Sequence, residues 1–318
     1  SLMGFNRGGW ESARVSIDSS GRATIFSGSM SQGHGHNTSL AQIAADVLQI
    51  PIESIDIVQG DTRQVQAGHG TFNSRSMAVG GSSVHVTSQR IVAKARKIAA
   101  SVLEVDEKDV SYRAGEFSVP GTDIAPLSFG KIARMAYVGH KLPDGMEPGL
   151  DETTFYDPAG MGSPSGIHMA YIEVDPETGM VDILDYVAVD DVGTIINPLL
   201  AAGQIHGGVV QGIAQALYEE VSYDPDTGQL MTGSLLDYAV PRAEHVPNIR
   251  SSFQETPSPT NPIGVKGVGE SGSIAAPPCM VHAVLDALSP FEILHLDMPM
   301  TPPRIWSAVQ QARAGVTQ

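Results

Sequence analysis

The sequence is poor in cysteine and in positive charge, and it lacks any long apolar run. Its single cysteine, Cys279, excludes an internal disulfide framework and any cysteine-rich zinc or iron–sulfur site within the chain, and it favours a reducing, cytoplasmic setting. With 19 Lys and Arg against 35 Asp and Glu, the formal net charge of -16 argues against a surface that binds nucleic-acid backbones. No stretch reaches the roughly 18 to 20 apolar residues of a membrane helix, so no membrane span is expected.

At 318 residues the chain is long enough for two modest hydrophobic cores. Two segments, which begin near Ala13 and Met169, share a layout of strand, tight turn, strand, glycine-rich loop and helix, and we interpret them as an internal structural repeat. Residues 139–166 are rich in Gly, Pro and Asp and are predicted to form an extended linker or surface arm. We therefore predict a mixed α+β architecture with two lobes, residues 8–150 and 151–318.

Apolar periodicity and capping residues place the main helices. They are predicted after Asn37 or Thr38 and over residues 82–103, 199–220 and 277–288, with a short strand and a terminal helix after the last. The third of these helices is rich in glycine, and each glycine costs up to about 1 kcal/mol relative to alanine. Such a cost indicates that another backbone or a ligand approaches closely. The glycines concerned are Gly203, Gly207, Gly208 and Gly212.

Four glycine-rich segments combine small residues with side-chain donors, a pattern that lets backbone N–H groups approach an anion. They are residues 32–36, 68–76, 190–211 and 266–272. One such loop is more often a turn or a helix cap, but four in one chain favour a large phosphorylated cofactor. The spacings lack the lysine of a phosphate-binding P-loop and the dinucleotide-binding fingerprint, which makes ATP and NAD poor candidates.

Glu270 is the candidate for acid–base chemistry. It is framed by Gly269 and Gly272 and followed by an apolar run, so it is predicted to lie in a partly dry pocket, where the charged form of a carboxylate is disfavoured and a general base is useful. The alternative is a surface glutamate on a flexible turn. The ten histidines form no His-Glu-x-x-His or other recognisable ligand pattern, so no metal ligated directly by protein side chains is predicted.

These residues resemble those of a known family. The run 264–272 resembles the Gly-Val-Gly-Glu signature of molybdenum hydroxylases, which include xanthine and aldehyde oxidoreductases, aerobic carbon monoxide dehydrogenase and dehydrogenases of nitrogen heterocycles. The resemblance covers nearly the whole chain, through residues 31–38, 60–62, 71–76, 190–193, 197–198, 203–208 and 256–259. It implies the C-terminal half of the molybdopterin-binding large subunit of this family.

The resemblance also implies roles for single residues. Glu270 corresponds to the catalytic base, and molybdenum is held by the dithiolene of molybdopterin, with or without an attached cytosine nucleotide, so no protein ligand to the metal is needed. One departure is His34, which stands where many relatives have Gln. The implied cofactor-binding residues are Gln32, Gly33, His34, Gly35, Ser74, Arg75, Ser76, Asp191, Asn197, Gln204, Lys266, Gly267 and Gly269.

The resemblance further implies partners that this sequence does not contain. They are the N-terminal half of the same subunit and the iron–sulfur and FAD subunits or domains that receive electrons. The expected reaction oxidises an aldehyde, a nitrogen heterocycle or a carbon monoxide-like substrate, with water as the oxygen source. Either the subunit is naturally split or the sequence is a fragment, and in both cases the chain alone is expected to be inactive. Two alternatives stay open: a non-catalytic subunit or apo fragment that keeps the fold without cofactor, and a stand-alone nucleotide-binding protein.

Overall fold

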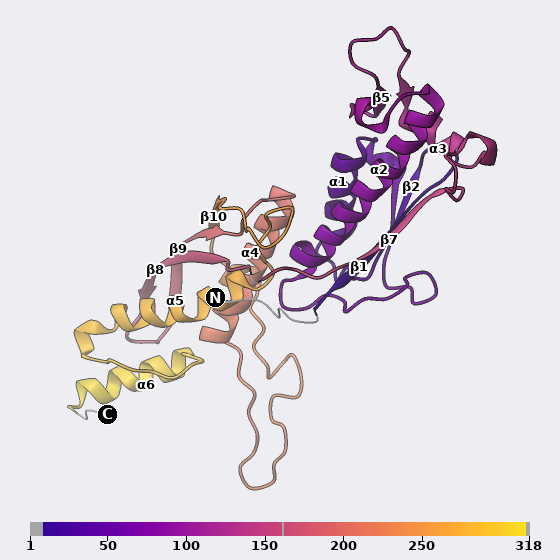
Figure 1. Ribbon diagram of the computed structural model, residues 1–318. Helices are drawn as coiled ribbons and strands as arrows, with labels where there is room; N and C mark the ends of the chain where they lie inside the picture. Colours follow the sequence, from indigo (N-terminus) through magenta and orange to yellow (C-terminus); the bar gives the residue numbers. More distant parts are fainter. Residues whose placement is uncertain (1–8, 161, 316–318) are drawn as a thin grey trace.

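The predicted α+β architecture is confirmed. The computed structural model describes residues 9–160 and 162–315; Gly8, Met161 and residues 316–318, which belong to the predicted lobes and linker, lie outside the described residues. Two mixed sheets, each with helices packed on it, stand beside each other along the molecule (Figure 1). Their hydrophobic cores are separate: one is built from residues 13–150 and the other from residues 186–309.

The first sheet has the strand order β3-β2-β1-β7. Strand β2 pairs antiparallel with β1 and parallel with β3, and β7 pairs antiparallel with β1. Helices α1 and α2 pack on it, and a small sheet with the order β4-β5-β6 and helix α3 complete this part. The bounds are β1 Glu11–Ile17, β2 Ala23–Ser27, α1 His36–Leu48, β3 Ile55–Val58, α2 Ser82–Leu103, β4 Ser111–Arg113, β5 Glu116–Ser118, β6 Leu127–Ser128, α3 Phe129–Met135 and β7 Leu150–Tyr156.

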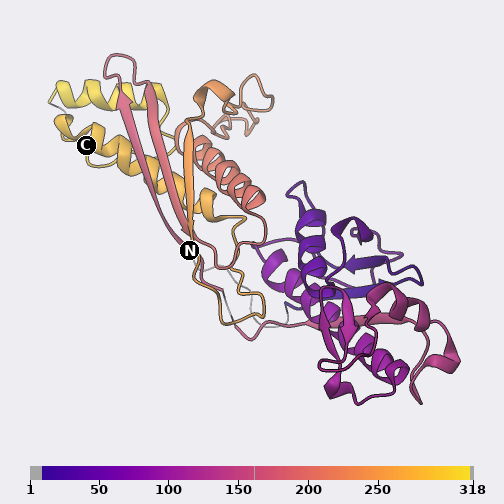
Figure 2. The same ribbon diagram turned by 90° about the horizontal axis from the view of Figure 1, so that it is seen from above.

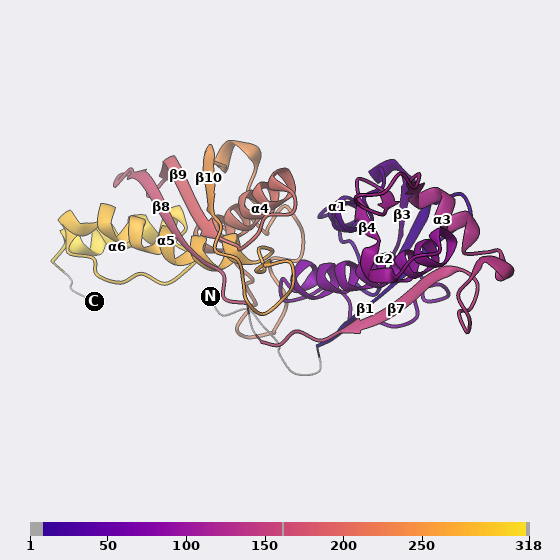
Figure 3. The ribbon, with the colours of Figure 1, turned by 45° about the horizontal axis from the view of Figure 1, so that its top comes forward.

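The second sheet has the strand order β10-β9-β8. Strand β9 pairs antiparallel with β8 and parallel with β10, while α4 and α5 pack against one face (Figure 3). The C-terminal helix α6 lies near α5 at the far end of the molecule from the first sheet (Figure 2). The bounds are β8 Ser165–Val174, β9 Val181–Asp191, α4 Pro198–Leu217, β10 Ile249–Gln254, α5 Ser271–Ala287 and α6 Pro302–Arg313.

The internal repeat is longer than the sequence predicts. In each copy two antiparallel strands are followed by a helix and then by a third strand that pairs parallel with the second: β3 beside β2, and β10 beside β9. A further helix follows in both copies, α2 in the first and α5 in the second. Each copy therefore runs strand, strand, helix, strand, helix. The third strands are short and flanked by glycine, proline or polar residues, which leaves a weak signal in the sequence.

Several boundaries differ from the predictions. Residues 150–156 of the predicted linker form β7, because Leu150 and Thr154 are buried against the first core while Gly and Pro surround them in the sequence. The predicted strand after α5 is absent from the described residues, which hold a short 3-10 turn there. The first helix starts at His36, one residue after Gly35, whose φ of 74° makes it the N-cap in place of Asn37 or Thr38.

Helix α5 begins at Ser271, before the predicted start at Pro277. Both Pro277 and Pro278 lie inside the helix. A proline in a helix removes a backbone hydrogen bond and normally costs about 3 kcal/mol. Here the ring of Pro277 packs against α4, since a Cβ on Gly212 would lie 2.7 Å from its Cδ. Packing against α4 and β8 compensates for the lost hydrogen bonds.

The close approach predicted from the glycines of α4 is confirmed for two of them. A Cβ on Gly208 would lie 2.9 Å from the backbone nitrogen of Ser273, and one on Gly212 would lie 2.6 Å from the Cβ of Ala276, so α4 and α5 pack nearly backbone to backbone. Nothing lies within 4 Å of a Cβ on Gly203 or Gly207, so the prediction is wrong for these two with respect to neighbouring protein.

This difference gives a matched pair of substitutions in one helix. Gly208→Ala gains helix propensity but forces α5 away, and overpacking of this kind costs about 1–3 kcal/mol. Gly207→Ala gains the same propensity without a clash, so it should raise the free energy of unfolding by up to about 1 kcal/mol. Urea denaturation measures the change in the free energy of unfolding, which should be negative for Gly208→Ala and positive for Gly207→Ala. Equal changes in the two variants would contradict the packing described for α4 and α5.

Candidate active site

A cavity of about 330 Å³ lies where the two parts of the chain meet. The lining from the first part comes from the loops before α1 and α2, and the lining from the second part comes from the loops before α4 and α5. The lining residues are Gln32, His34, His36, Ser39, Thr71, Phe72, Asn73, Ser74, Ser76, Met77, Val192, Thr194, Ile195, Ile196, Asn197, Leu200, Ala201, Gln204, Val265, Lys266, Gly267, Val268, Gly269 and Glu270. The four glycine-rich segments predicted from the sequence thus contribute to one cavity.

Most of the predicted site residues line this cavity, and four do not. Gly33, Gly35, Arg75 and Asp191 are absent from the lining. Gly33 and Gly35 have positive φ and shape the loop that carries Gln32 and His34. His36, Asn73 and Thr194 also line the cavity. Each lies within one of the predicted glycine-rich segments, but none is among the single residues predicted to bind the cofactor, and membership of these segments is their only signal in the sequence.

Four helical N-termini border the cavity. They belong to α1 at His36, to the π-helical segment Ser76–Gly81 that leads into α2, to α4 at Pro198 and to α5 at Ser271. The free backbone N–H groups and the aligned peptide dipoles at a helix N-terminus favour negative charge. Although the chain carries a formal net charge of -16, this cavity therefore suits an anion.

Glu270 is the only carboxylate among the described residues that line the cavity. It is the N-cap of α5 and is half-buried. The hydroxyl of Ser74 donates to Oε2 of Glu270 at 2.8 Å, and the backbone N–H of Glu270 donates to the same hydroxyl oxygen at 3.0 Å. Ser74 belongs to the first part of the chain and Glu270 to the second, so this double contact fixes the carboxylate and joins the two parts.

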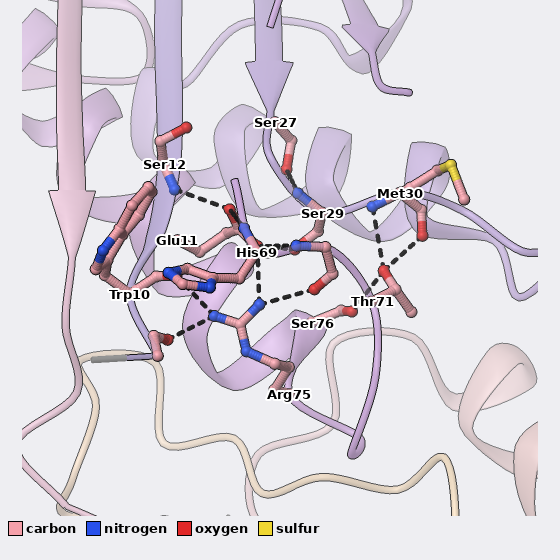
Figure 4. Close-up of polar contacts among 12 residues, drawn as sticks. Trp10, Glu11, Ser12, Ser27, Ser29, Met30, His69, Thr71, Arg75 and Ser76 are labelled. Atoms are coloured by element: carbon pink, nitrogen blue, oxygen red, sulfur yellow. Dashed lines mark hydrogen bonds and ion pairs between the residues drawn. The ribbon is translucent and has the colours of Figure 1, made fainter. Parts of the chain in front are cut away.

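The loop that carries Ser74 is fixed by a buried ion pair (Figure 4). Nη1 of Arg75 lies 2.8 Å from Oε2 of Glu11, and the two side chains are 7% and 0% exposed. Arg75 also donates to the backbone oxygens of Gly9, Trp10 and Gly70, while Glu11 accepts from the N–H groups of His69 and Gly70. The guanidinium of Arg75 therefore binds its own chain.

Ser74 follows this anchor in an unusual backbone conformation. Asn73 and Ser74 have φ values of 46° and 52°, in the left-handed region that non-glycine residues rarely adopt. The opposite loop comes so close that a Cβ on Gly267 would lie 2.5 Å from the backbone oxygen of Ser74. Strained residues of this kind persist where the surroundings over-determine them, and they cluster at functional sites.

A second ion pair fixes the loop before Glu270. Nζ of Lys266 lies 2.9 Å from Oδ2 of Asp191, with the side chains 11% and 15% exposed. Oδ1 of Asp191 accepts the N–H groups of Gly193 and Thr256. Burial raises the pKa of Asp191, but hydrogen bonds from Lys266 and from these backbone groups outweigh it and lower that pKa to about 2.

Asn197 has a structural role that the sequence does not show. Its side-chain oxygen accepts the N–H of Leu200 and caps α4, and its amide group donates to Gln42 of α1 at 2.9 Å. The two parts of the chain are thus joined a second time, by a contact between Asn197 and Gln42.

Two neighbouring histidines with tilted rings form another part of the wall. The rings of His34 and His36 lie 3.8 Å apart between centroids. Burial, followed by the nearby His34, lowers the pKa of His36 to about 4, so this ring is neutral near pH 7. Nδ1 of His36 is buried and has no hydrogen-bond partner among the described residues. It is a polar group that a bound molecule could satisfy.

The donor set fits an anionic, phosphorylated pterin cofactor. Amide, hydroxyl, imidazole and ammonium groups from Gln32, Ser76, His36, Gln204 and Lys266 surround the cavity together with the helix N-termini. Within residues 9–160 and 162–315, no group of three or more His, Cys, Asp or Glu side chains is placed to hold a metal ion.

Comparisons with known proteins agree with this fold and site. A family model described as a molybdopterin cofactor-binding domain matches residues 1–247. The carbon monoxide dehydrogenase large chain of Hydrogenophaga pseudoflava is 40% identical over 304 residues, which cover 96% of this chain and 38% of the relative. The nicotine 6-hydroxylase large subunit of Paenarthrobacter nicotinovorans is 42% identical over 301 residues, 94% of this chain and 37% of the relative.

Solved structures show the same likeness. A Cu,Mo-CO dehydrogenase in its carbon monoxide-reduced state superposes with a TM-score of 0.91 at 36% identity, covering 98% of this chain and 38% of that chain. Quinoline 2-oxidoreductase from Pseudomonas putida 86 superposes with a TM-score of 0.89 at 39% identity, covering 95% and 38%. The fold and the family model define a cofactor-binding domain with a cavity between its two repeats. The chain belongs to the molybdopterin-binding family of molybdenum hydroxylase large subunits, and it spans less than two fifths of the length of these relatives.

The pair of Asp191 and Lys266 predicts how the site responds to acid. The folded-state pKa of Asp191, about 2, lies below its ordinary value of 3.8, so the pair stabilises the fold fully above about pH 3.8 and loses this effect as the pH falls towards 2. Lys266→Met removes the main hydrogen bond to the carboxylate and brings the folded-state pKa of Asp191 back towards 3.8. The variant should therefore melt at a lower temperature than the parent chain near pH 6, but lose less melting temperature than the parent as the pH falls from about 4 to 2. Melting curves measured from pH 2 to about pH 6 test this, with Asp286→Asn on the exposed side of α5 as the control. An unchanged acid profile in Lys266→Met would contradict it.

Proposed function

We propose that this chain is the cofactor-binding part of a molybdenum hydroxylase in which Glu270 is the catalytic base. The observation that carries the proposal is the position of this carboxylate in a cavity that is bordered by four helical N-termini. A base in such a place faces a bound anionic cofactor directly. When bound, the molybdenum–pterin cofactor supplies the redox chemistry that oxidises the substrate with water as the oxygen source.

The chain's own residues divide the remaining work. Oε2 of Glu270 is held by Ser74, and Oε1 accepts no hydrogen bond from the described residues, so Oε1 is the oxygen that takes the proton of the attacking water-derived hydroxyl group. Gly33, Gly35, Arg75 and Asp191 shape the loops. The residues proposed to hold the pterin, its phosphate and an attached cytosine nucleotide are Gln32, His34, Ser76, Asn197, Gln204, Lys266, Gly267 and Gly269.

The proposed enzyme needs companions. The curated relatives are named large chains or subunits, and this chain spans only 37–38% of the length of the first two. We propose that the remaining part of the large subunit completes the active site, that iron–sulfur and FAD subunits receive the electrons, and that the complex works in the cytoplasm. The substrate belongs to the aldehydes, nitrogen heterocycles or carbon monoxide-like molecules. No helix within the described residues is long and apolar enough to cross a membrane.

Glu270→Gln tests the catalytic assignment. Loss of a general base lowers turnover by about 10²- to 10⁴-fold. We expect dye reduction by the complex assembled with its companion chains to fall by at least that lower figure, while the molybdenum content per chain stays unchanged because the amide keeps the shape of the side chain. Turnover equal to that of the parent complex would refute the role of Glu270. An assembled parent complex without molybdenum or pterin would favour the alternative of a non-catalytic apo subunit.

Ser74→Ala tests the support of this base. A hydrogen bond to a charged group contributes about 1.5–3 kcal/mol, so its loss should lower kcat about tenfold or more and leave KM and molybdenum content nearly unchanged. Hydrogen exchange of the Glu270 amide should also accelerate in the isolated chain. Ser74→Gly removes both the hydroxyl and the backbone strain at this residue, and its turnover should fall as in Ser74→Ala. Asn73→Gly removes the backbone strain at the neighbouring residue but keeps the Ser74 hydroxyl. A loss of turnover in Asn73→Gly equal to that in Ser74→Ala would assign the effect to loop strain.

The alternative of a stand-alone nucleotide-binding protein predicts a different experimental result. A stand-alone ATP- or NAD-binding protein would show a higher melting temperature with either nucleotide, because a ligand that binds only the folded state stabilises it. The P-loop lysine and the dinucleotide fingerprint are missing from the loops around the cavity, so we expect no shift with either compound.

A further inference from the structure

One face of the second sheet carries several large apolar side chains that are exposed to water. On β8, Ile167, Met169 and Tyr171 point away from the helices and are 72%, 65% and 69% exposed. On β9, Leu184 and Val189 are 54% and 41% exposed. Val189 pairs directly with Ile167 in the register of the two strands, while Tyr171 pairs with Asp185, whose carboxylate forms an ion pair with Arg250 of β10. These exposed side chains make up one face of the two strands. We call it the β8–β9 face.

The opposite face of the same strands is already part of a core. Tyr186 and Ala188 are fully buried, and Ala170 and Ile172 pack with them against α4 and α5 (Figure 3). Strand β8 is therefore apolar on both faces. An antiparallel sheet with one face in water normally alternates apolar and polar residues, and strands that are apolar on both faces are typical of sheets covered on both sides.

The other copy of the repeat shows that this is not a general property of the unit. The outward residues of β1 are Arg14 and Ser16, and Thr24 faces outward from β2. Phe26 is the apolar exception there, and the guanidinium of Arg14 covers it at 5.0 Å from the ring centroid. On β7, Phe155 is 57% exposed on the same side and packs edge-to-face with Trp10. The outer faces of β1 and β2 are thus mainly polar, whereas those of β8 and β9 carry several exposed large apolar side chains.

We propose that the β8–β9 face is the surface on which the remaining part of the large subunit packs. This inference rests on the part of the proposed function that gives the chain a companion polypeptide. In the Cu,Mo-CO dehydrogenase structure the same fold, with a TM-score of 0.91, takes up only 38% of one chain, so a larger body of protein is covalently continuous with it. A rigid apolar sheet face is the kind of surface that such a neighbouring core buries.

The charge of the chain argues against a second copy as the occupant. Two copies of a chain with a formal net charge of -16 repel each other. Acidic side chains also border the face, since Glu173 on β8 and Asp182 on β9 are exposed and form a cross-strand pair. Self-association would bring these carboxylates together, whereas the companion is free to present neutral or basic groups to them.

The test measures binding of a defined companion. The probe is the part of the Hydrogenophaga pseudoflava carbon monoxide dehydrogenase large chain that lies outside its match to this protein, co-produced with this protein's full chain. Met169→Lys and Tyr171→Lys, alone and together, place charges on the β8–β9 face without touching either core. Leu294→Lys is the matched control, because Leu294 is an exposed large apolar residue, 89% accessible, that belongs to no strand of this sheet.

We expect the parent chain and Leu294→Lys to bind the companion equally, and the double variant to bind about tenfold more weakly or worse, since large side chains at the centre of an interface dominate binding. Backbone amides of β8 and β9 should exchange more slowly in the complex. Equal binding by the double variant, or no binding by the parent chain, would overturn the proposal. A parent chain that sediments as a dimer, and becomes a monomer in the double variant, would assign the face to a second copy instead. Molybdenum content, measured in parallel, keeps this result separate from the proposed function, because a chain can dock its companion without cofactor.

Discussion

The buried pair of Glu11 and Arg75 is the constraint on which the site depends. A carboxylate and a guanidinium that are almost fully buried are stable only when their remaining hydrogen-bonding groups are satisfied, and removal of one partner of such a pair typically costs about 3–5 kcal/mol. Here the backbone of the loop supplies these hydrogen bonds: the N–H groups of His69 and Gly70 donate to Glu11, and the backbone oxygen of Gly70 accepts from Arg75. The ion pair therefore holds residues 69–75 against the first strand, and it fixes the position from which Ser74 contacts Glu270. A loop of glycine and small residues would otherwise have many accessible conformations.

This anchoring explains how a cavity between two separate cores can be well defined. The two parts of the chain have no common hydrophobic core. Ile196 and Ile263 of the second part pack against the first core, and polar contacts, chiefly Ser74 with Glu270 and Gln42 with Asn197, join the two parts as well. Hydrogen bonds form only within a narrow range of distances and angles. Because the loops that form them are held in place, the position of the Glu270 carboxylate is fixed too. The lack of other carboxylates in the described lining leaves the helix N-termini as the dominant field, and an anion is attracted although the protein as a whole is acidic.

The sequence predicts what is local and misses what depends on distant partners. The alternation in residues 13–17 and the apolar periodicity of residues 82–103 are sufficient for the first strand and the long helix. Strand β7 escapes prediction because its partner β1 lies far away in the sequence. The prolines of α5 resemble a helix start, and only the contact with α4 shows why the helix begins earlier.

The same division applies to the candidate site. Glu270 is predictable because glycines frame it, and those glycines also allow the loops to meet. The bond from Ser74 spans 196 residues of sequence and has no local signature. Arg75 shows the limit most clearly: an arginine in a glycine-rich loop has the chemistry of an anion contact, but the burial of Glu11, which engages its guanidinium, cannot be seen without coordinates.

The repeat accounts for the geometry of the whole site. Each copy contains two helices that follow strands of one sheet, and in both copies the N-termini of both helices border the cavity. The first pair is α1 and the π-helical segment before α2, and the second pair is α4 and α5. Ser74 and Glu270 occupy corresponding places, each just before the second helix of its copy. The two copies therefore bring four helix N-termini to one cavity, and they place the hydroxyl of Ser74 where it donates a hydrogen bond to Glu270.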